Sequence, residues 1–391
     1  MTSITPNAQR LLRSLVVDGP TYRADLARAL DVSRATATNL TTRLIEDCWA
    51  EELKDEPGSL RNPIGTSTRL GVLASVMFLV DSYTVTLAHF DGRVLRNLTL
   101  TGPSGRPALE RMTAAATLVR TLLAEAGLAP TALRALHLAV DTQMDVQTGD
   151  VFASRASSRW YGVNPIGFFT EQFGVPVYAQ NTARLEGQAE YLWGVGGEHT
   201  NLLYVEVSYG VTSGHIVDGV IASGARGGSG EIGHTVYDWS GPLCTCGNTG
   251  CLMQYASIPA LLRDFSTVSG MEARWSRFQG LVAAGDPTAT QVADRAAVVL
   301  GRVLTNLCHV IDPDTIVLSG EVSLLPGFLD RTATTLRELA LPLVARNVRV
   351  VAAGLADRHT ATARAGIESL RRAEAVIAAA TSGQPPQERE P

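Results

Sequence analysis

Three cysteines lie close together in a glycine-rich segment, and they constrain the fold more than any other feature of this sequence. Cys244, Cys246 and Cys251 stand in Gly-Pro-Leu-Cys-Thr-Cys-Gly-Asn-Thr-Gly-Cys, and His234 ends the preceding segment Gly-Glu-Ile-Gly-His. The glycines let the backbone turn tightly enough for three sulfur atoms to converge. Three thiolates and one imidazole fill a tetrahedral shell with no open position, which is typical of a structural zinc site. A redox pair or three inert thiols is the alternative, but this spacing with a nearby histidine favours zinc.

Strand-sized apolar runs alternate with helical segments from residue 71 to about residue 380. The expected strands are 76–80, 85–90, 136–140, 176–179, 202–207, 215–217, 315–318 and 348–352, and the expected helices are 109–127, 182–194, 289–311 and 360–380. This alternation implies a two-lobed α/β body. The chain of 391 residues is longer than one compact domain normally requires. Residues 381–391 have no apolar anchor, and we expect a disordered tail there.

Residues 7–47 have the pattern of three helices joined by tight turns. Gly19-Pro20 ends the first helix, residues 22–30 form a second short helix, and Ser33 is the N-cap of a third that runs to about residue 47. A short helix, a tight turn and a helix with a small polar surface form the helix-turn-helix pattern. Residues 49–53 and 67–72 are expected to be two strands around the loop 56–65, which would make a wing.

The third helix has no acidic side chain between residues 33 and 45. This surface favours DNA binding over the alternative, a three-helix packing domain without DNA contact. The helix would enter the major groove, and the wing would touch backbone phosphates. The expected DNA contacts are Ser33, Arg34, Thr36, Thr38, Asn39, Thr42 and Arg43 from the helix, and Arg61 and Arg69 from the wing.

Charge and hydropathy exclude several classes of protein. A formal net charge of −5 argues against one large nucleic-acid-coating surface, and an apolar content of 45% excludes wholesale disorder. No stretch approaches the roughly 18 apolar residues of a membrane span, and residues 1–10 do not have the order of a signal peptide. Five cysteines are too few and too clustered for a disulfide framework, so we expect a cytoplasmic protein.

The motifs around the cysteines resemble the signature of the ROK family (repressors, open reading frames and kinases). The resemblance rests on Gly230-Glu-Ile-Gly-His234, on Cys244-x-Cys246-Gly-x-x-Gly-Cys251 and on the segment 311–320, and it covers nearly all of residues 71–380. It implies a multidomain α+β and α/β protein with a two-lobed actin-like body, commonly a dimer or tetramer. A winged helix-turn-helix in front of this body distinguishes the family's transcription factors from its sugar kinases.

The resemblance also implies domain boundaries. Residues 1–70 would be the winged helix-turn-helix domain. Residues 71–180 would be the N-terminal lobe, completed by the C-terminal helix 360–380. Residues 181–359 would be the C-terminal lobe, with the zinc loop over 234–251.

Three motifs depart from the pattern of the family's kinases. In those enzymes an Asn-Asp pair begins the helix after the inter-lobe strand, and its Asp deprotonates the sugar hydroxyl; here the pair is Asn181-Thr182. A threonine hydroxyl cannot act as a general base near neutral pH. The first phosphate loop, D-x-G-x-T, is Asp81-Ser-Tyr-Thr here, without glycine, and the second, G-T-G-x-G-x-G, is Ser-Tyr-Gly-Val-Thr-Ser-Gly over 208–214. We therefore expect no catalytic residue and no kinase activity.

The family's hexose contacts are retained only in part. Asn181, Glu231 and His234 match them, whereas the glutamate after the last cysteine falls on Met253, or on Gln254 if the alignment slips by one. Losing two carboxylates that accept hydroxyl hydrogen bonds weakens the binding of a polyol. Either a sugar-type effector binds Asn181, Glu231 and His234 in the cleft between the lobes, or Glu231 and His234 remain only because they build the zinc loop.

These observations lead to one expected function and two alternatives. We expect a DNA-binding transcriptional regulator of carbohydrate metabolism, a repressor, that is non-catalytic and responds to a sugar or sugar-derived effector. Its partners would be double-stranded operator DNA, expected to be palindromic, and further copies of the chain in a homodimer or homotetramer, with no membrane partner. The alternatives are a sugar kinase with an accessory N-terminal domain, and a binding module whose helix-turn-helix only mediates dimerisation.

Overall fold

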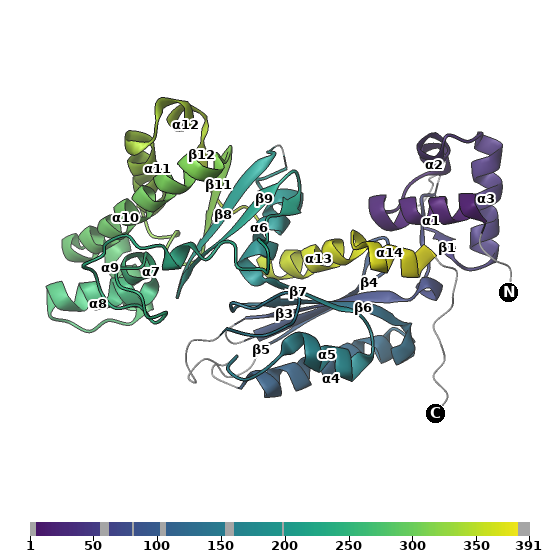
Figure 1. Ribbon diagram of the computed structural model, residues 1–391, viewed down its shortest axis with the longest axis horizontal. Coiled ribbons are helices and arrows are strands. Elements are labelled where there is room, and N and C mark those ends of the chain that lie inside the picture. Colours follow the sequence, from purple (N-terminus) through teal and green to yellow (C-terminus); the bar gives the residue numbers. More distant parts are fainter. Residues whose placement is uncertain are drawn as a thin grey trace. The chain divides into compact units, whose positions relative to one another are not determined.

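The computed structural model of the protein describes residues 5–54, 62–79, 82–101, 107–152, 160–197 and 199–381. The chain divides into two compact units, one of Met1–Gln180 with Thr362–Pro391 and the other of Asn181–Ala361. Each unit is built around a five-stranded sheet, and the first also contains the N-terminal helices (Figure 1). The expected fold class, a winged helix-turn-helix followed by a two-lobed α/β body, is confirmed. None of the helices in the described part of the chain has both the length and the apolar character that crossing a membrane requires.

The N-terminal region has three helices followed by a short hairpin. The elements are α1 (Pro6–Asp18), α2 (Arg23–Leu30), α3 (Arg34–Glu46), β1 (Ala50–Glu52) and β2 (Ile64–Thr66), and the two strands pair antiparallel. The prediction that residues 67–72 form the second strand of the wing is wrong. The Ser67 hydroxyl accepts a hydrogen bond from the Arg69 amide at 3.2 Å, which turns residues Thr68–Leu70 into a 3-10 helix. The strand of the wing therefore lies earlier, at β2.

The sheet of the first unit has the strand order β5-β4-β3-β6-β7. Its elements are β3 (Val72–Phe78), β4 (Ser82–Ala88), β5 (Val94–Thr101), α4 (Ala108–Glu125), β6 (Leu133–Val140), α5 (Pro165–Phe173) and β7 (Val177–Asn181). Alternate residues of β3 face opposite sides, because side chains of a strand point up and down in turn. Val72, Ala74 and Val76 share a core with α4 and α5, whereas Leu73 belongs to the core on the other face.

The C-terminal segment forms two helices, and the expectation of one continuous helix over 360–380 is wrong. The two are α13 (Arg358–Arg371) and α14 (Glu374–Thr381). The break allows Val376 and Ile377 to join the buried core that contains residues of α1. Thr381, expected in the disordered tail, is the last residue of α14, and the rest of the tail, 382–391, lies outside the described residues.

The sheet of the second unit has the strand order β10-β9-β8-β11-β12. Its strands are β8 (Asn201–Val207), β9 (Val211–Val217), β10 (Val220–Ile221), β11 (Thr315–Ser319) and β12 (Arg349–Ala352). Its helices are α6 (Thr182–Trp193), α7 (Met253–Ala256), α8 (Ile258–Ser269), α9 (Trp275–Ala283), α10 (Pro287–Ile311), α11 (Phe328–Leu339) and α12 (Pro342–Asn347). Ala183 of α6 packs on one face of the sheet, while the long helix α10 contributes to the core on the other. The cysteine segment connects β10 to α7.

Candidate DNA-binding surface, metal centre and effector site

One side of α3 is buried and the other is polar and exposed. Ala37, Thr41 and Leu44 recur at helical spacing and form the buried side. All seven residues assigned from the sequence to this helix or its cap are exposed, namely Ser33, Arg34, Thr36, Thr38, Asn39, Thr42 and Arg43. The helix therefore presents a continuous polar surface without an acidic group until its last residue, Glu46.

Some of these exposed side chains stabilise the helix itself. Ser33 is the N-cap, because its Oγ accepts a hydrogen bond from the amide of Thr36 at 3.0 Å. The Thr38 hydroxyl donates to a backbone carbonyl one turn earlier, at 2.9 Å. The described residues provide no hydrogen-bond or ion-pair partner for four other side chains, those of Arg34, Asn39, Thr42 and Arg43. These four are available to a ligand.

The two arginines assigned to the wing differ in position. Arg61 lies outside the described residues. The expectation that Arg69 lies on a wing strand is wrong, because it belongs to the 3-10 helix after β2. Its Nη1 donates to the carbonyl of Asp47 at 2.7 Å, and its guanidinium lies 4.9 Å from the centre of the Trp49 ring. Arg69 therefore holds the C-terminal end of α3 against β1.

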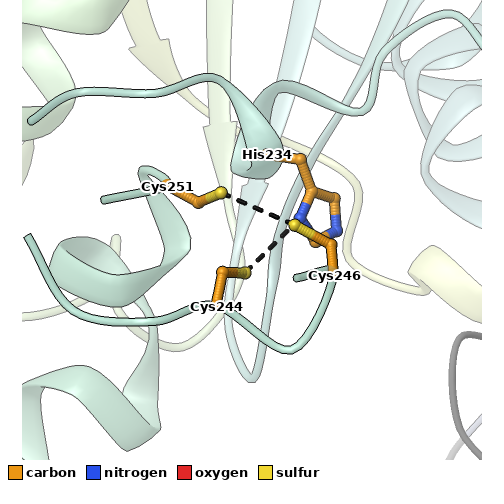
Figure 2. A group of neighbouring side chains, drawn as sticks. All are labelled: His234, Cys244, Cys246 and Cys251. Atoms are coloured by element: carbon orange, nitrogen blue, oxygen red, sulfur yellow. Dashed lines mark hydrogen bonds between the residues drawn. The ribbon is translucent and has the colours of Figure 1, made fainter. Parts of the chain in front are cut away.

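His234, Cys244, Cys246 and Cys251 come together in one cluster, with all four candidate ligand atoms within 4.8 Å of one another (Figure 2). The Sγ atoms of Cys246 and Cys251 are 3.7 Å apart, and Cys244 Sγ lies 3.7 Å from His234 Nδ1. Sulfur atoms at the corners of a tetrahedron with metal–sulfur distances of 2.3 Å lie about 3.8 Å apart. The cluster thus has the donor set and the size to hold a metal ion.

Two thiols of the cluster differ in their pKa. Burial acts to raise the pKa of Cys244, but hydrogen bonds from Cys246, His234 and Cys251 outweigh it and lower that pKa to about 6. Burial, together with hydrogen bonds to Cys246 and Cys244, raises the pKa of Cys251 to about 12. One thiolate is therefore stabilised by protons that its neighbours retain, and a divalent cation would replace those protons.

The candidate effector residues lie on two adjacent segments of the second unit. Asn181 caps α6, since its Oδ1 accepts a hydrogen bond from the amide of Ala183 at 2.9 Å. Glu231 precedes a short turn that ends at His234. Its carboxylate lies 3.7 Å from Nη2 of Arg184, whose side chain is 2% exposed. Burial raises the pKa of Glu231, and the charges of Arg184 and His234 oppose that shift.

Sequence reasoning did not single out Arg184. Its ion pair with Glu231 joins α6 to the segment that carries His234. Arg184 lies in the first turn of α6 and is buried, and a buried cation requires a partner. The Glu231 carboxylate, which the sequence predicted as an effector contact, is thus already paired with Arg184.

The structure describes some of the positions at which the sequence departs from the pattern of the family's kinases. Thr182 is 5% exposed at the start of α6, and its hydroxyl has no hydrogen-bond partner among the described residues. The Ser208 hydroxyl donates to the carboxylate of Glu321, which puts a negative charge at the turn between β8 and β9. A carboxylate there repels a phosphate. Asp81, from the other loop, lies outside the described residues, and Tyr83 lies within β4.

The sequence is similar to that of one protein family and to that of a repressor. A model described as the ROK family matches residues 111–367, more than half of the chain. The xylose repressor of Bacillus spizizenii is 24% identical over 319 residues, which cover 81% of this chain and 82% of the repressor.

Two solved structures resemble the fold. A ROK family transcriptional regulator, a homologue of the E. coli MLC protein, has a TM-score of 0.76 and 20% identity and covers 96% of this chain and 98% of that chain. A ROK hexokinase from Thermus thermophilus has a TM-score of 0.64 and 24% identity; the match covers 97% of that chain but 76% of this one. The likeness to the regulator extends over a larger part of the chain than the likeness to the kinase.

Proposed function

The chain belongs to the ROK family, and from that premise we propose that it is a DNA-binding transcriptional repressor without catalytic activity. The observation that carries the proposal is the exposed, acid-free surface of α3 on a winged helix fold that precedes a ROK body. The xylose repressor relative, matched over most of both chains, supports the same function. A cytoplasmic location is part of the proposal, as is regulation of genes of sugar metabolism.

In this proposal α3 lies in the major groove of operator DNA. Asn39 and Arg43 would contact base edges, because an amide pairs with adenine and a guanidinium with guanine. Ser33, Arg34, Thr36, Thr38 and Thr42 would contact bases or phosphates around them. Arg61 and Arg69 would add phosphate contacts, Arg69 from beside the C-terminal end of α3. A dimer or tetramer would read a palindromic operator, because two-fold symmetry of the protein is matched in the half-sites.

A genome-wide DNA pull-down with the purified full-length protein tests this function. We expect one or a few enriched fragments, and gel shifts on the recovered DNA that weaken steeply as salt is raised, because phosphate contacts release counterions. Recovery of no fragment above the level of a protein with Asn39→Ala and Arg43→Ala would refute DNA binding. That result would favour the hypothesis that the helix-turn-helix only mediates dimerisation.

We propose that the cluster of His234, Cys244, Cys246 and Cys251 holds a structural zinc ion. Its three sulfurs and one imidazole nitrogen match the ligand set of closed zinc sites, and no position is left for substrate. When bound, the ion supplies folding energy to the loop rather than chemistry.

We also propose that a sugar-type effector binds against Asn181, Glu231 and His234. Thr182 and Met253 stand where carboxylates would accept hydroxyl hydrogen bonds, and Arg184 already engages Glu231. Plain hexoses should therefore bind weakly. Calorimetry with glucose, N-acetylglucosamine and xylose tests this, and tight binding that survives Glu231→Ala would place the site elsewhere.

A further inference from the structure

The winged helix and the first lobe share one hydrophobic core. Residues of α1 such as Leu12 and Leu15, and Ile64 of β2, lie in the same buried cluster as Phe90 after β4 and Leu370 of α13. Shared burial of this kind opposes relative motion, because the two parts cannot separate without exposing apolar surface. The DNA-binding elements are therefore packed onto the lobe.

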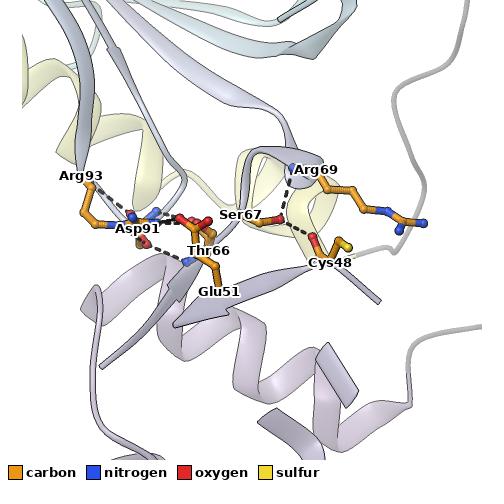
Figure 3. Close-up of polar contacts among 7 residues, drawn as sticks. All are labelled: Cys48, Glu51, Thr66, Ser67, Arg69, Asp91 and Arg93. Atoms are coloured by element: carbon orange, nitrogen blue, oxygen red, sulfur yellow. Dashed lines mark hydrogen bonds and ion pairs between the residues drawn. The ribbon is translucent and has the colours of Figure 1, made fainter. Parts of the chain in front are cut away.

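A buried carboxylate connects the wing to the lobe. Asp91, in the turn between β4 and β5, has a fully buried side chain and accepts a hydrogen bond from the amide of Thr66 in β2 at 2.7 Å (Figure 3). The amide of Asp91 donates to the Thr66 hydroxyl at 3.1 Å, so the connection is reciprocal. A Cβ added to Gly65 would lie 2.6 Å from Asp91 Oδ2, so this approach requires glycine on the wing strand.

Arg93 extends this connection to both strands of the wing. Its Nε donates to Asp91 at 2.9 Å, and its Nη2 donates to the carbonyl of Thr66 at 2.6 Å and to Glu51 of β1 at 2.8 Å. All the described partners of the Asp91 carboxylate, which are the Thr66 amide and the amide and Nε of Arg93, are donors. This position thus requires a side chain that accepts hydrogen bonds at both of its oxygens, as a carboxylate does.

A second connection lies at the end of α13. The Nε of Arg371 donates to the carbonyl of Val16 in α1 at 2.8 Å and to that of Phe90 at 3.1 Å, and its Nη1 pairs with Glu368 at 2.5 Å. One buried guanidinium thus holds the C-terminal end of α1 beside the turn that carries Asp91. A Cβ added to Gly92 in that turn would lie 2.6 Å from Arg371 Nη1.

We propose that Asp91 is a positioning residue for DNA binding, through which the β4–β5 turn orients the wing beside α3 and joins the winged helix to the first lobe as one body. This inference rests on the proposed DNA-binding function. A buried residue of the lobe, which would not touch DNA, would then affect operator affinity through the position of the wing. The geometry of the wing would then depend on the lobe and not on the wing sequence alone.

Asp91→Asn is the informative substitution, because asparagine has nearly the same shape but presents an NH2 group to at least one of these donors. The control is Glu374→Gln, which removes the exposed ion pair between Arg13 of α1 and Glu374 of α14. That pair connects the same two parts of the chain but lies in solvent, where such pairs contribute little. Both variants are made in the full-length chain.

Two measurements separate positioning from simple loss of stability. Operator affinity is measured together with the active fraction from stoichiometric titration, because unfolded molecules lower that fraction and not the affinity of the rest. Hydrogen exchange by mass spectrometry follows peptides over 62–72 and 86–93, with peptides of α10 as an internal reference. For Asp91→Asn we expect an affinity at least ten-fold weaker and faster exchange in both peptides, with α10 and the Glu374→Gln protein unchanged.

Affinity within two-fold of the wild type would overturn the positioning role even if exchange rises, because the connection would then be only structural. Unchanged exchange in both peptides would overturn the connection itself. A wild-type protein that binds no DNA would refute the proposed function and with it the effect on affinity, while the exchange pattern would still decide whether Asp91 joins wing and lobe. If Asp91→Asn does not fold, Thr66→Val replaces it, because this variant removes one hydroxyl of the same network. Unchanged operator affinity or unchanged exchange in Thr66→Val would then overturn the proposal in the same way.

Discussion

At the scale of single residues, exposure and hydrogen-bond partners separate side chains with structural roles from those available for recognition. In α3, Ser33 and Thr38 make hydrogen bonds within the helix, whereas the described residues offer no such partner for Asn39 or Arg43. Buried titratable groups at this scale also carry a measurable dependence of stability on pH.

We expect Asn39→Ala and Arg43→Ala each to weaken operator binding by about 10- to 100-fold, since a lost bidentate base contact costs about 1–3 kcal/mol. Arg337→Ala, on an exposed position of α11 in the second unit, removes the same charge and is the control. Fluorescence anisotropy on the recovered operator measures the effect. If all three variants bind equally well, α3 is not the recognition helix.

His137 should make the protein less stable in mild acid. Burial lowers the pKa of this imidazole to about 4, and its Nδ1 has no hydrogen-bond partner among the described residues. Because the unfolded chain binds the proton more tightly, the free energy of unfolding is highest above the unfolded pKa and falls as the pH drops from about 6.5 towards 4, by on the order of 3 kcal/mol.

Urea unfolding at pH 7 and pH 5 measures this dependence. His137→Gln should reduce the loss of stability between the two pH values, whereas Ser75→Ala should retain it, because Ser75 is the neighbour of His137 in the β3–β6 register but does not titrate. An unchanged loss in His137→Gln would show that other groups are responsible.

At the scale of elements, backbone hydrogen bonds and close backbone packing hold the cysteine loop. The amide of Gly250 donates a hydrogen bond to the carbonyl of Pro242 at 2.8 Å, and the amide of Cys244 donates one to the carbonyl of Asn248 at 2.7 Å. Gly250 has a φ of 71°, and a Cβ there would lie 1.5 Å from the carbonyl oxygen of Asp238. The loop therefore depends on glycine at this position for both conformation and space.

Zinc should be present at about one ion per chain in the freshly purified protein, and Cys246→Ser should reduce both zinc content and melting temperature. Folding energy is lost together with the metal because the loop is organised around it. Mass spectrometry of metals and thermal unfolding measure the two effects. Cys48→Ser is the control, since Cys48 is exposed and outside the cluster; a full complement of zinc in Cys246→Ser would contradict the ligand assignment.

Gly250→Ala and Gly247→Ala distinguish packing from backbone conformation in the same loop. Both glycines have a positive φ, so each alanine should cost about 1 kcal/mol of conformational strain. A Cβ at Gly247 meets nothing within 4 Å, whereas one at Gly250 meets backbone atoms. We expect the larger drop in melting temperature, and loss of zinc, only for Gly250→Ala. Equal drops in melting temperature for the two variants would mean that backbone strain alone destabilises the loop.

At the scale of the whole molecule, the chain combines a winged helix-turn-helix region with a ROK body, and our proposal that it has no catalytic activity applies to that body. Thr182 lacks the basicity of a carboxylate, and Glu321 places a negative charge at the turn after β8. These changes lie on different elements, so restoring one leaves the other in place.

We therefore expect no ATP-dependent phosphorylation of glucose, N-acetylglucosamine or xylose, and no gain of activity in Thr182→Asp. A coupled assay of ADP release measures this, with an active ROK hexokinase as the positive control. Thr182→Asp combined with Glu321→Ser tests whether the altered turn is the second obstacle. Substantial turnover by the wild type would establish the kinase reading instead.

Local sequence patterns were enough to identify the family, the class of fold and the cluster of cysteines. Ser33 as an N-cap, the end of α1 at Gly19 and the close spacing of Cys244, Cys246 and Cys251 act over a few residues, so the sequence shows them directly. The family found by motif resemblance is confirmed by the match over residues 111–367.

Other features depended on contacts between segments far apart in the chain. The wing strand lies at β2 rather than at 67–72, because a side-chain hydrogen bond of Ser67 competes with strand pairing. Strand β5 was missed because nearly all of its residues are exposed, so that it has no alternating apolar pattern. The final helix divides because Val376 and Ile377 are buried with residues of α1. Asp91, Arg184 and Arg371 likewise have partners on distant segments, namely Thr66, Glu231 and Val16, which only the folded chain brings close.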